Sequence, residues 1–390
     1  MSTSRPIPNR IAAMAPELTE WRRDIHTHPE LGLEEVRTAA IVAQKLAEWG
    51  IEVHTGLAKT GVVGTLKVGN GTRSIGIRAD MDALAMEEAN GFAHRSQSPG
   101  KMHACGHDGH TAMLLGAARY LAETRRFSGT VNFIFQPGEE GAGGALAMLA
   151  DGLFERFACD AIFGMHNRPG SPIGQFSITP GPAMSGGAFF DVDIVGKGAH
   201  GARPEEAVDP VLAASHIVTA LQSIVARNVS PFDMAVVSVT RISGGEAYNV
   251  IPERARLGGT VRAMRREVLD RAEAALQRLA SSTAAAFGAA AKVDFRVIFA
   301  PLVNHAEETR EIADAAAEIA GEANVDRNKP PAPASEDFSF MLEKVPGAFI
   351  NIGNGRSAPV HNDRYDFNDE AIPYGAALLA RVAERRLARP

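Results

Sequence analysis

The sequence of 390 residues predicts an α/β protein in which a doubly wound sheet is interrupted by an inserted second module. Near both ends of the chain, short apolar strands alternate with helical segments, which is typical of a sheet covered by helices on both faces. In between, the predicted order β-α-β-β-α-β is that of a ferredoxin-like module. We therefore expect one domain from residues 1–182 and 300–390, and a second from residues 183–299, since this length is large for one core.

The first predicted elements are helices. Residues 10–49 read as two helices that are separated at His28-Pro29, because the residue before a proline avoids the helical conformation. Two strands follow, at 61–68 and 73–78. Gly69-Asn70-Gly71 lies between them and predicts a hairpin turn.

Polar residues stand where several predicted strands end. Strands are expected at 130–135 and 159–164, with a glycine- and alanine-rich helix between them. Asp80, Glu139 and His166 each lie at the carboxyl end of a predicted strand. Ligands of doubly wound sheets bind beyond those ends, so these side chains are candidates for one site.

The inserted module and the last part of the chain are predicted from apolar periodicity and capping residues. In the module we expect a strand at 189–195, a helix opened by Asp209 as cap and Pro210, strands at 234–242 and 254–262, a helix at 267–285 and a strand at 292–299. After it we expect a helix at 306–320, a helix capped by Ser335, a strand at 347–353 and a final helix capped by Asn368.

Composition excludes several classes of partner. A net charge of −6 with mixed signs gives no electrostatic footprint for nucleic acid, and no apolar run is long enough to cross a membrane. Residues 1–8 lack the apolar core of a secretory signal peptide. The two cysteines are far apart, which argues against a disulfide framework. We therefore expect a cytoplasmic protein that binds neither nucleic acid nor membrane.

The segment from Met102 to His110 is the densest cluster of metal-binding side chains. It holds three histidines, one cysteine and one aspartate, although the chain has only twelve histidines and two cysteines. Cys105, His107 and Asp108 offer the thiolate, imidazole and carboxylate groups that bind transition metals. The apolar residues after it predict a helix, so the cluster lies on a loop that enters a helix. A polar turn is the alternative reading.

More candidate ligands follow. Glu139-Glu140 comes after a strand, and in extended backbone two successive carboxylates point opposite ways. One could then bind metal while the other acts as a general base on water. His166 and His361 would read alone as a core histidine and a surface turn. Together with Cys105, His107 and Glu140 they make five ligands, too many for one tetrahedral ion and enough for two ions that share ligands.

The inserted module carries two further motifs. Gly196 to Gly201 fits the dinucleotide-binding pattern G-x-G-x-x-G, but Pro204 follows too closely for a helix to open there. We interpret it as a loop that presents His200 and Arg203. Arg262 at a strand end can bind a carboxylate bidentately or form a surface ion pair, and the residues alone do not decide between these.

Taken together, the motifs resemble the M20 metallopeptidase and amidohydrolase family, in the branch of hippurate hydrolase and the N-acyl- and indole-acetyl-amino-acid amidohydrolases. The resemblance extends over nearly the whole chain. It is carried by residues 23–32, 78–84, 102–110, 136–141, 164–167, 196–200, 248–252, 335–338 and 361–362. One departure is Ala85, where the branch usually has proline.

The resemblance implies a metallopeptidase-like catalytic domain that holds two divalent ions and an inserted lid that mediates dimerisation. The donor set suits Mn, Zn, Co or Ni. The ligands it implies are Cys105, His107, Glu140, His166 and His361. It implies that Glu139 is the general base and that Asp82 and Asp80 steady the site. It also implies that His200 reaches the partner subunit's site and binds the carbonyl oxygen there. Asn249 and Arg262 match positions that bind the substrate's carbonyl and carboxylate.

The expected function is therefore metal-dependent hydrolysis of N-acyl amino acids, hippurate-like or N-acetylated, by a homodimer or higher homo-oligomer. A dipeptidase or aminopeptidase of the same family is an alternative, although no carboxylate for a free amine could be placed. A binding protein without turnover is another alternative. The intact base and ligand set argue against it, because a binding protein has no need for a base beside its metals.

Overall fold

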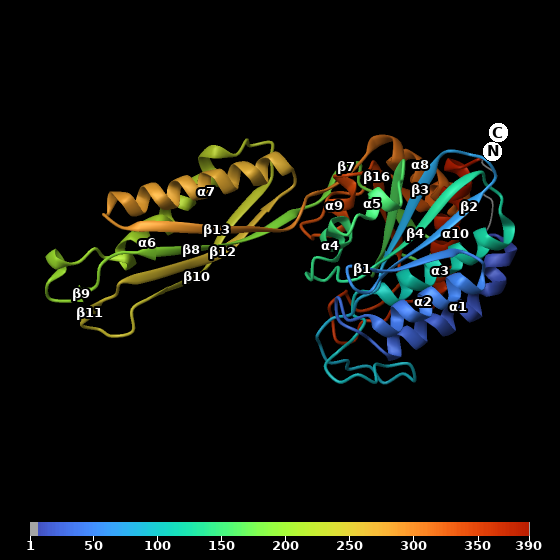
Figure 1. Ribbon diagram of the computed structural model, residues 1–390, viewed down its shortest axis with the longest axis horizontal. Helices are drawn as coiled ribbons and strands as arrows, with labels where there is room; N and C mark the ends of the chain where they lie inside the picture. Colours follow the sequence, from blue (N-terminus) through green and yellow to red (C-terminus); the bar gives the residue numbers. More distant parts are fainter. Residues whose placement is uncertain (1–6, 390) are drawn as a thin grey trace. The chain divides into compact units, whose positions relative to one another are not determined.

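The computed structural model describes residues 7–389, which fall into two units (Figure 1). The first unit comprises Met1–Gly181, Val303–Pro330 and Asp337–Pro390, and the second comprises Pro182–Leu302 and Pro331–Glu336. The segment 1–8, for which no signal-peptide core was expected, lies mostly outside the described residues. The segment 331–336 was expected in the first domain, but it joins the second because the Ser185 N–H donates to the carbonyl of Ala334 at 2.9 Å.

The first unit is built on a mixed sheet of eight strands. Their order is β1 (Glu52–Leu57), β2 (Gly61–Val68), β4 (Gly129–Gln136), β3 (Ser74–Asp80), β5 (Ala161–Arg168), β16 (Gly347–Gly353), β6 (Phe176–Ser177) and β15 (Val325–Asp326). The four central strands β4, β3, β5 and β16 run parallel, so their carboxyl ends meet at one edge. This edge carries the candidate site, as the sequence predicted.

The predicted hairpin between β2 and β3 was wrong. Strand β4 lies between them and pairs antiparallel with β2 and parallel with β3. The Gly71 N–H donates to Ser128 Oγ, next to the start of β4, instead of closing a two-strand turn. Strand β1 was not predicted, because its residues are mostly polar and partly exposed at the edge of the sheet.

Helices cover both faces of this sheet. They are α1 (Asn9–Thr27), α2 (Val36–Glu48), α3 (His107–Thr124), α4 (Gly144–Ala150), α5 (Leu153–Arg156), α8 (Ala306–Ala320), α9 (Phe338–Leu342) and α10 (Ile372–Arg386). The side chains of successive residues of β5 point to opposite faces of the sheet, so they contact the two different helix layers. Gly164 lies against Phe338 of α9, whereas Met165 contacts the α3 and α10 side at Gly375.

The second unit has the predicted β-α-β-β-α-β order. Its elements are β8 (Gly186–Val195), α6 (Pro210–Leu221), β10 (Ala235–Gly244), β12 (Arg254–Ala263), α7 (Arg266–Ala286) and β13 (Ala290–Phe299). The sheet order β10-β12-β8-β13 is antiparallel throughout, and α6 and α7 pack on it. Asp209 caps α6 as predicted, accepting hydrogen bonds from the N–H groups of Val211 and Leu212.

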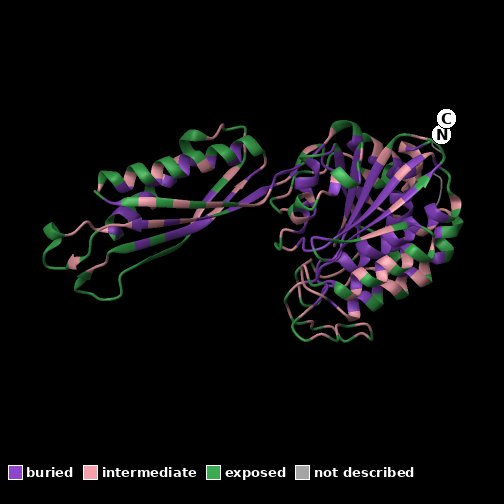
Figure 2. Cartoon of the chain, viewed as in Figure 1, coloured by how far each residue is buried: buried purple, intermediate pink, exposed green. Residues whose placement is uncertain are grey.

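Each unit has its own hydrophobic core, which Figure 2 shows as buried strands and inward helix faces. One core surrounds β3, β4 and β5, and the other lies between the β8–β12 strands and the helices α6 and α7. Within residues 7–389, no helix combines the length and apolarity needed to cross a bilayer.

Candidate metal centre and active site

The loop before α3 brings Cys105 and His107 to the carboxyl edge of the sheet. A helix was expected only after the cluster, but α3 already begins at His107, so the first turn of the helix holds the end of the cluster. Gly106 before it has a φ of 94°. A Cβ at Gly106 would lie 2.3 Å from Asn167 Nδ2. That amide donates to the carbonyl of Cys105 at 2.6 Å. Glycine is therefore required here both by conformation and by space, and the close packing fixes the two candidate ligands.

The five predicted ligands converge. Candidate atoms of Cys105, His107 and His166 all lie within 4.8 Å of one another, and so do those of Cys105, Glu140 and His361. The closest pairs are Cys105 Sγ with His166 Nε2 at 3.3 Å, and Glu140 Oε1 with His361 Nε2 at 3.2 Å. The two groups share Cys105, which is the arrangement expected for two ions with a common ligand.

Hydrogen bonds leave the correct histidine nitrogens available for metal. His166 Nδ1 lies 2.7 Å from the carbonyl of Asn167, and His107 Nδ1 lies 3.1 Å from Asp82 Oδ1. Such bonds turn Nε2 toward a metal. His107 Nε2 is buried and has no hydrogen-bond partner within the described part of the chain. Burial and the neighbouring His110 lower the pKa of His166 to about 3, which keeps it neutral. These residues fit the binding of divalent ions.

Asp80 and Asp82 hold residues of the site in place through hydrogen bonds and do not belong to the five predicted ligands. Asp82 Oδ2 accepts from the N–H of Glu140 at 2.9 Å and Asp82 Oδ1 contacts His107, so this one carboxylate positions two candidate ligands. Asp80 lies between His110 Nδ1 at 2.6 Å and Arg78 Nη1 at 2.8 Å. Although burial opposes ionisation, the charges of these neighbours and His107 hold the pKa of Asp80 well below its usual range. Both its oxygens already have partners in the protein.

Glu139 and Glu140 lie in a turn after β4 rather than in extended backbone, so the expected opposite orientation was wrong. Both carboxylates have an oxygen within 4.8 Å of a His107 nitrogen. The turn is held by the buried Glu35, whose Oε1 accepts from the N–H of Gly138 at 2.9 Å. We call the two groups of candidate ligands that contain Cys105 the shared-cysteine groups. Glu139 is buried and belongs to neither of them, which is compatible with a role as a base beside the ligand that Glu140 would provide.

His361 reaches the site through an unusual backbone conformation. Its φ is 62°, in the left-handed region that residues with a Cβ seldom adopt. The His361 N–H donates to the carbonyl of Ala104, next to Cys105, at 2.8 Å. Strain of this kind persists where the surroundings impose it, and it is frequent at functional sites. The alternative reading of His361 as a surface turn is correct for its position, since it lies in a turn and its side chain is 53% exposed, but its Nε2 also lies 3.2 Å from Glu140 Oε1.

A buried charge network behind the site was missed from the sequence. Arg22 is fully buried and donates to Asp108 at 2.7 Å and to Asp366. His26 Nδ1 also lies 2.8 Å from Asp108. Although burial opposes ionisation, the Arg22 charge and His26 hold the pKa of Asp108 well below its usual range. A signal was present, since Arg22 continues the buried stripe of α1 formed by Leu18 and neighbouring apolar residues.

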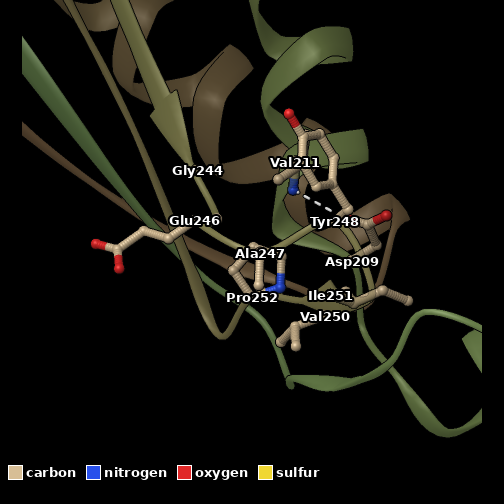
Figure 3. A pocket seen from close by; sticks show the side chains of 10 residues that line it. Asp209, Val211, Gly244, Glu246, Ala247, Tyr248, Val250, Ile251 and Pro252 are labelled. Carbon is tan, nitrogen blue, oxygen red and sulfur yellow. Dashed lines mark hydrogen bonds between the residues drawn. The ribbon is translucent and has the colours of Figure 1, made fainter.

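His200 and Asn249 lie in the second unit and are neighbours there. Strand β9 (Ala199–His200) pairs with β11 (Val250–Ile251), and the Gly201 N–H donates to the carbonyl of Asn249 at 2.8 Å. No helix opens in the G-x-G-x-x-G segment, as expected. Both side chains are exposed. The loop from Gly244 to Pro252 lines an open pocket of about 370 Å³ beside the start of α6 (Figure 3).

Arg262 also lies in the second unit, on the central strand β12. Its Nη1 donates to Ser335 Oγ at 2.8 Å. The predicted role of Ser335 as a helix cap was therefore wrong, because α9 begins at Phe338 and Asp337 is the residue before it. Of the two alternatives left open for Arg262, the surface ion pair is not found among residues 7–389.

Comparison with known proteins gives consistent matches. The model of peptidase family M20/M25/M40 matches residues 76–385. Hippurate hydrolase of Campylobacter jejuni is 42% identical and covers 95% of this chain and 97% of its own length. An IAA-amino acid hydrolase of Arabidopsis thaliana is 39% identical over 98% of this chain and 89% of its own. A solved Bacillus subtilis protein, described as a dinuclear metal-binding peptidase of the M20 family, aligns with a TM-score of 0.84 and 34% identity over 96% of this chain and 99% of its own.

Proposed function

This chain belongs to peptidase family M20/M25/M40, and we propose that it hydrolyses the amide bond of N-acyl amino acids to a carboxylic acid and a free amino acid. The observation that carries the proposal is the convergence of Cys105, His107, Glu140, His166 and His361 with Glu139 beside them. The relatives named for hippurate and for IAA-amino acids support an N-acylated amino acid as the substrate class.

The chain's own residues divide the work of hydrolysis. Two divalent ions held by the five ligands would supply a Lewis acid and lower the pKa of a water molecule. Glu139 takes the proton of the attacking water and later donates it to the leaving amine nitrogen, which completes the proton balance of the reaction. Asp82 keeps His107 and the Glu140 backbone in place.

The second unit supplies the contacts to substrate in this proposal. His200 donates to the developing oxyanion, and Asn249 binds the carbonyl group. Arg262 holds the α-carboxylate through paired N–H groups, which favours acylated amino acids over internal peptide bonds. The support for these roles is the exposure of His200 and Asn249 and the absence of an ion-pair partner for Arg262 among the described residues.

Removing the metal is expected to reduce turnover of N-acyl amino acids to the uncatalysed background. The protein would be stripped with a chelator under reducing conditions, because Cys105 can be oxidised, and then given Mn, Zn, Co or Ni singly. Restored hydrolysis of N-acyl substrates with a free carboxylate supports the proposal. Turnover of dipeptides alone would assign the protein to the peptidase branch, and metal uptake without any turnover would indicate a binding protein.

We also propose a homodimer that forms through the second unit, which then acts as lid and dimerisation domain. The support is strand β10, an edge strand whose Val236 and Ile242 side chains are 45% and 61% exposed. Such an edge is a template for pairing with a second copy. Both cysteines are free, which is compatible with the cytoplasmic location that we propose.

Ile242→Lys is expected to shift the protein from dimer to monomer, because a charge on the exposed edge of β10 opposes pairing. Sedimentation velocity measures the change. Val36→Lys, which alters a 69% exposed apolar side chain of the first unit, is the matched control and should remain dimeric. A monomeric wild-type protein, or an Ile242→Lys protein that stays dimeric, would contradict this interface.

A further inference from the structure

The guanidinium of Arg262 is fixed at one end only. Its Nη1 donates to Ser335 Oγ at 2.8 Å, and within residues 7–389 it has no carboxylate partner. An arginine has five N–H donors in a rigid plane, and the Nε and Nη2 groups form the edge that binds a carboxylate bidentately. The contact with Ser335 uses the other end of the group and leaves this edge available.

Gly187 provides the space in which that end lies. Gly187 is directly opposite Arg262 in the pairing of β8 with β12. A Cβ at Gly187 would lie 2.2 Å from Arg262 Nη1 and 3.0 Å from its Cζ. The backbone of Gly187 is not in the left-handed region, so conformation alone does not require glycine there. Glycine is required at position 187 because the Arg262 guanidinium occupies the space that a Cβ would fill.

Ser335 accepts from Arg262 without losing its own donor. A hydroxyl that accepts a hydrogen bond from Arg262 still has its own O–H to donate. Ser335 is partly buried in the same unit, within the segment 331–336. A carboxylate on the Nε–Nη2 edge of Arg262 is a planar, charged acceptor, whereas a carboxamide offers one neutral oxygen and an N–H₂ group that would face the arginine's donors.

We infer that Gly187 and Ser335 are specificity-determining residues that orient Arg262 for a substrate carboxylate. This inference rests on the proposed function, because it deepens the role given there to Arg262. Neither residue is a metal ligand or a proton donor in the reaction. Their effect is to fix the guanidinium plane, so that an acid is preferred to the corresponding carboxamide.

Two substitutions test this in the metal-loaded enzyme. Gly187→Ala places a methyl group against the flexible end of Arg262, so the guanidinium must move while the sheet can stay folded. Ser335→Ala removes the acceptor of Nη1. The measured quantity is the ratio of kcat/KM for an N-acyl amino acid to kcat/KM for its carboxamide. We expect each variant to lower this ratio about tenfold, the loss typical of one charge-assisted hydrogen bond.

The controls are chosen from the same unit. Gly258→Ala adds a methyl group to the same strand as Arg262, next to Asp191, and Ser215→Ala removes a hydroxyl that bonds only within α6. Both should keep the wild-type ratio. Circular dichroism would check that every variant is folded.

The outcomes separate this inference from the proposed function. A lowered ratio in both variants, with unchanged controls, supports the inference. If the wild type prefers the acid and Arg262→Ala abolishes that preference while Gly187→Ala and Ser335→Ala retain it, the inference alone is overturned. A wild type that hydrolyses neither compound, or both equally, overturns the proposed carboxylate contact and this inference with it.

Discussion

Glu139→Gln is expected to lower kcat for N-acyl amino acids by about 100- to 10,000-fold, the range typical for loss of a general base. Glutamine keeps the size of the side chain but cannot take a proton from water. Glu139 lies within reach of His107, yet it is outside the two groups of ligands that share Cys105. The substitution should therefore remove the proton transfer and leave the metal content intact.

The matched control is Glu140→Gln, one residue further along the same turn. Glu140 contacts His361 and belongs to a shared-cysteine group, so its substitution should lower the amount of metal bound as well as kcat. Metal content by mass spectrometry, measured beside steady-state kinetics, separates the two cases. A Glu139→Gln protein that keeps its metal and turns over at a near-normal rate would refute the assigned base.

Much of the candidate site could be predicted from the sequence, because histidine and cysteine are rare in this chain and Glu140 and His166 lie near the carboxyl ends of strands. The segment from Met102 to His110 predicted a loop followed by a helix, and the helix is found, although α3 begins at His107 and includes the end of the predicted loop. Helix α8 and strand β16 also have the predicted bounds. What these regions share is a local signal, since periodicity and caps are read within a short window.

Strand pairing and side-chain contacts between segments far apart in the chain could not be predicted from such local signals. Gly69-Asn70-Gly71 is a good hairpin signal, but it says nothing of β4, which enters between β2 and β3 from about 60 residues further along the chain. Ser335 is equally suited to cap a helix and to accept from an arginine, and only the fold brings Arg262 to it. A left-handed backbone at His361 has no local signature in the sequence.

The largest expected effect on stability comes from Arg22, which was not recognised from the sequence. Arg22 and Asp108 are separated by 86 residues, and both side chains are fully buried. Arg22→Met would remove the guanidinium paired with the buried Asp108 carboxylate and leave it only the imidazole of His26 nearby. Breaking one partner of a buried ion pair costs about 3–5 kcal/mol, so we expect a loss of that order in the free energy of unfolding.

The two tryptophans make this measurement specific to one unit. Trp21 and Trp49 both belong to the first unit, with ring centroids 5.7 Å apart, and the chain has only two tryptophans. Tryptophan fluorescence during urea unfolding therefore reports on the unit that contains Arg22. Arg256→Met, which alters an exposed ion pair with Asp193, should leave this transition unchanged.

A double variant decides why stability is lost. If the cost of Arg22→Met arises from an uncompensated charge, adding Asp108→Asn should recover much of it, because the amide needs no counter-charge. If the cost arises from a cavity, the second substitution should not help. Asp108 is also in the first turn of α3, next to His107, where a carboxylate interacts favourably with the helix N-terminus. Arg22 thus connects the stability of the α1–α3 packing to the position of His107, a proposed metal ligand, and Arg22→Met should weaken metal binding together with folding.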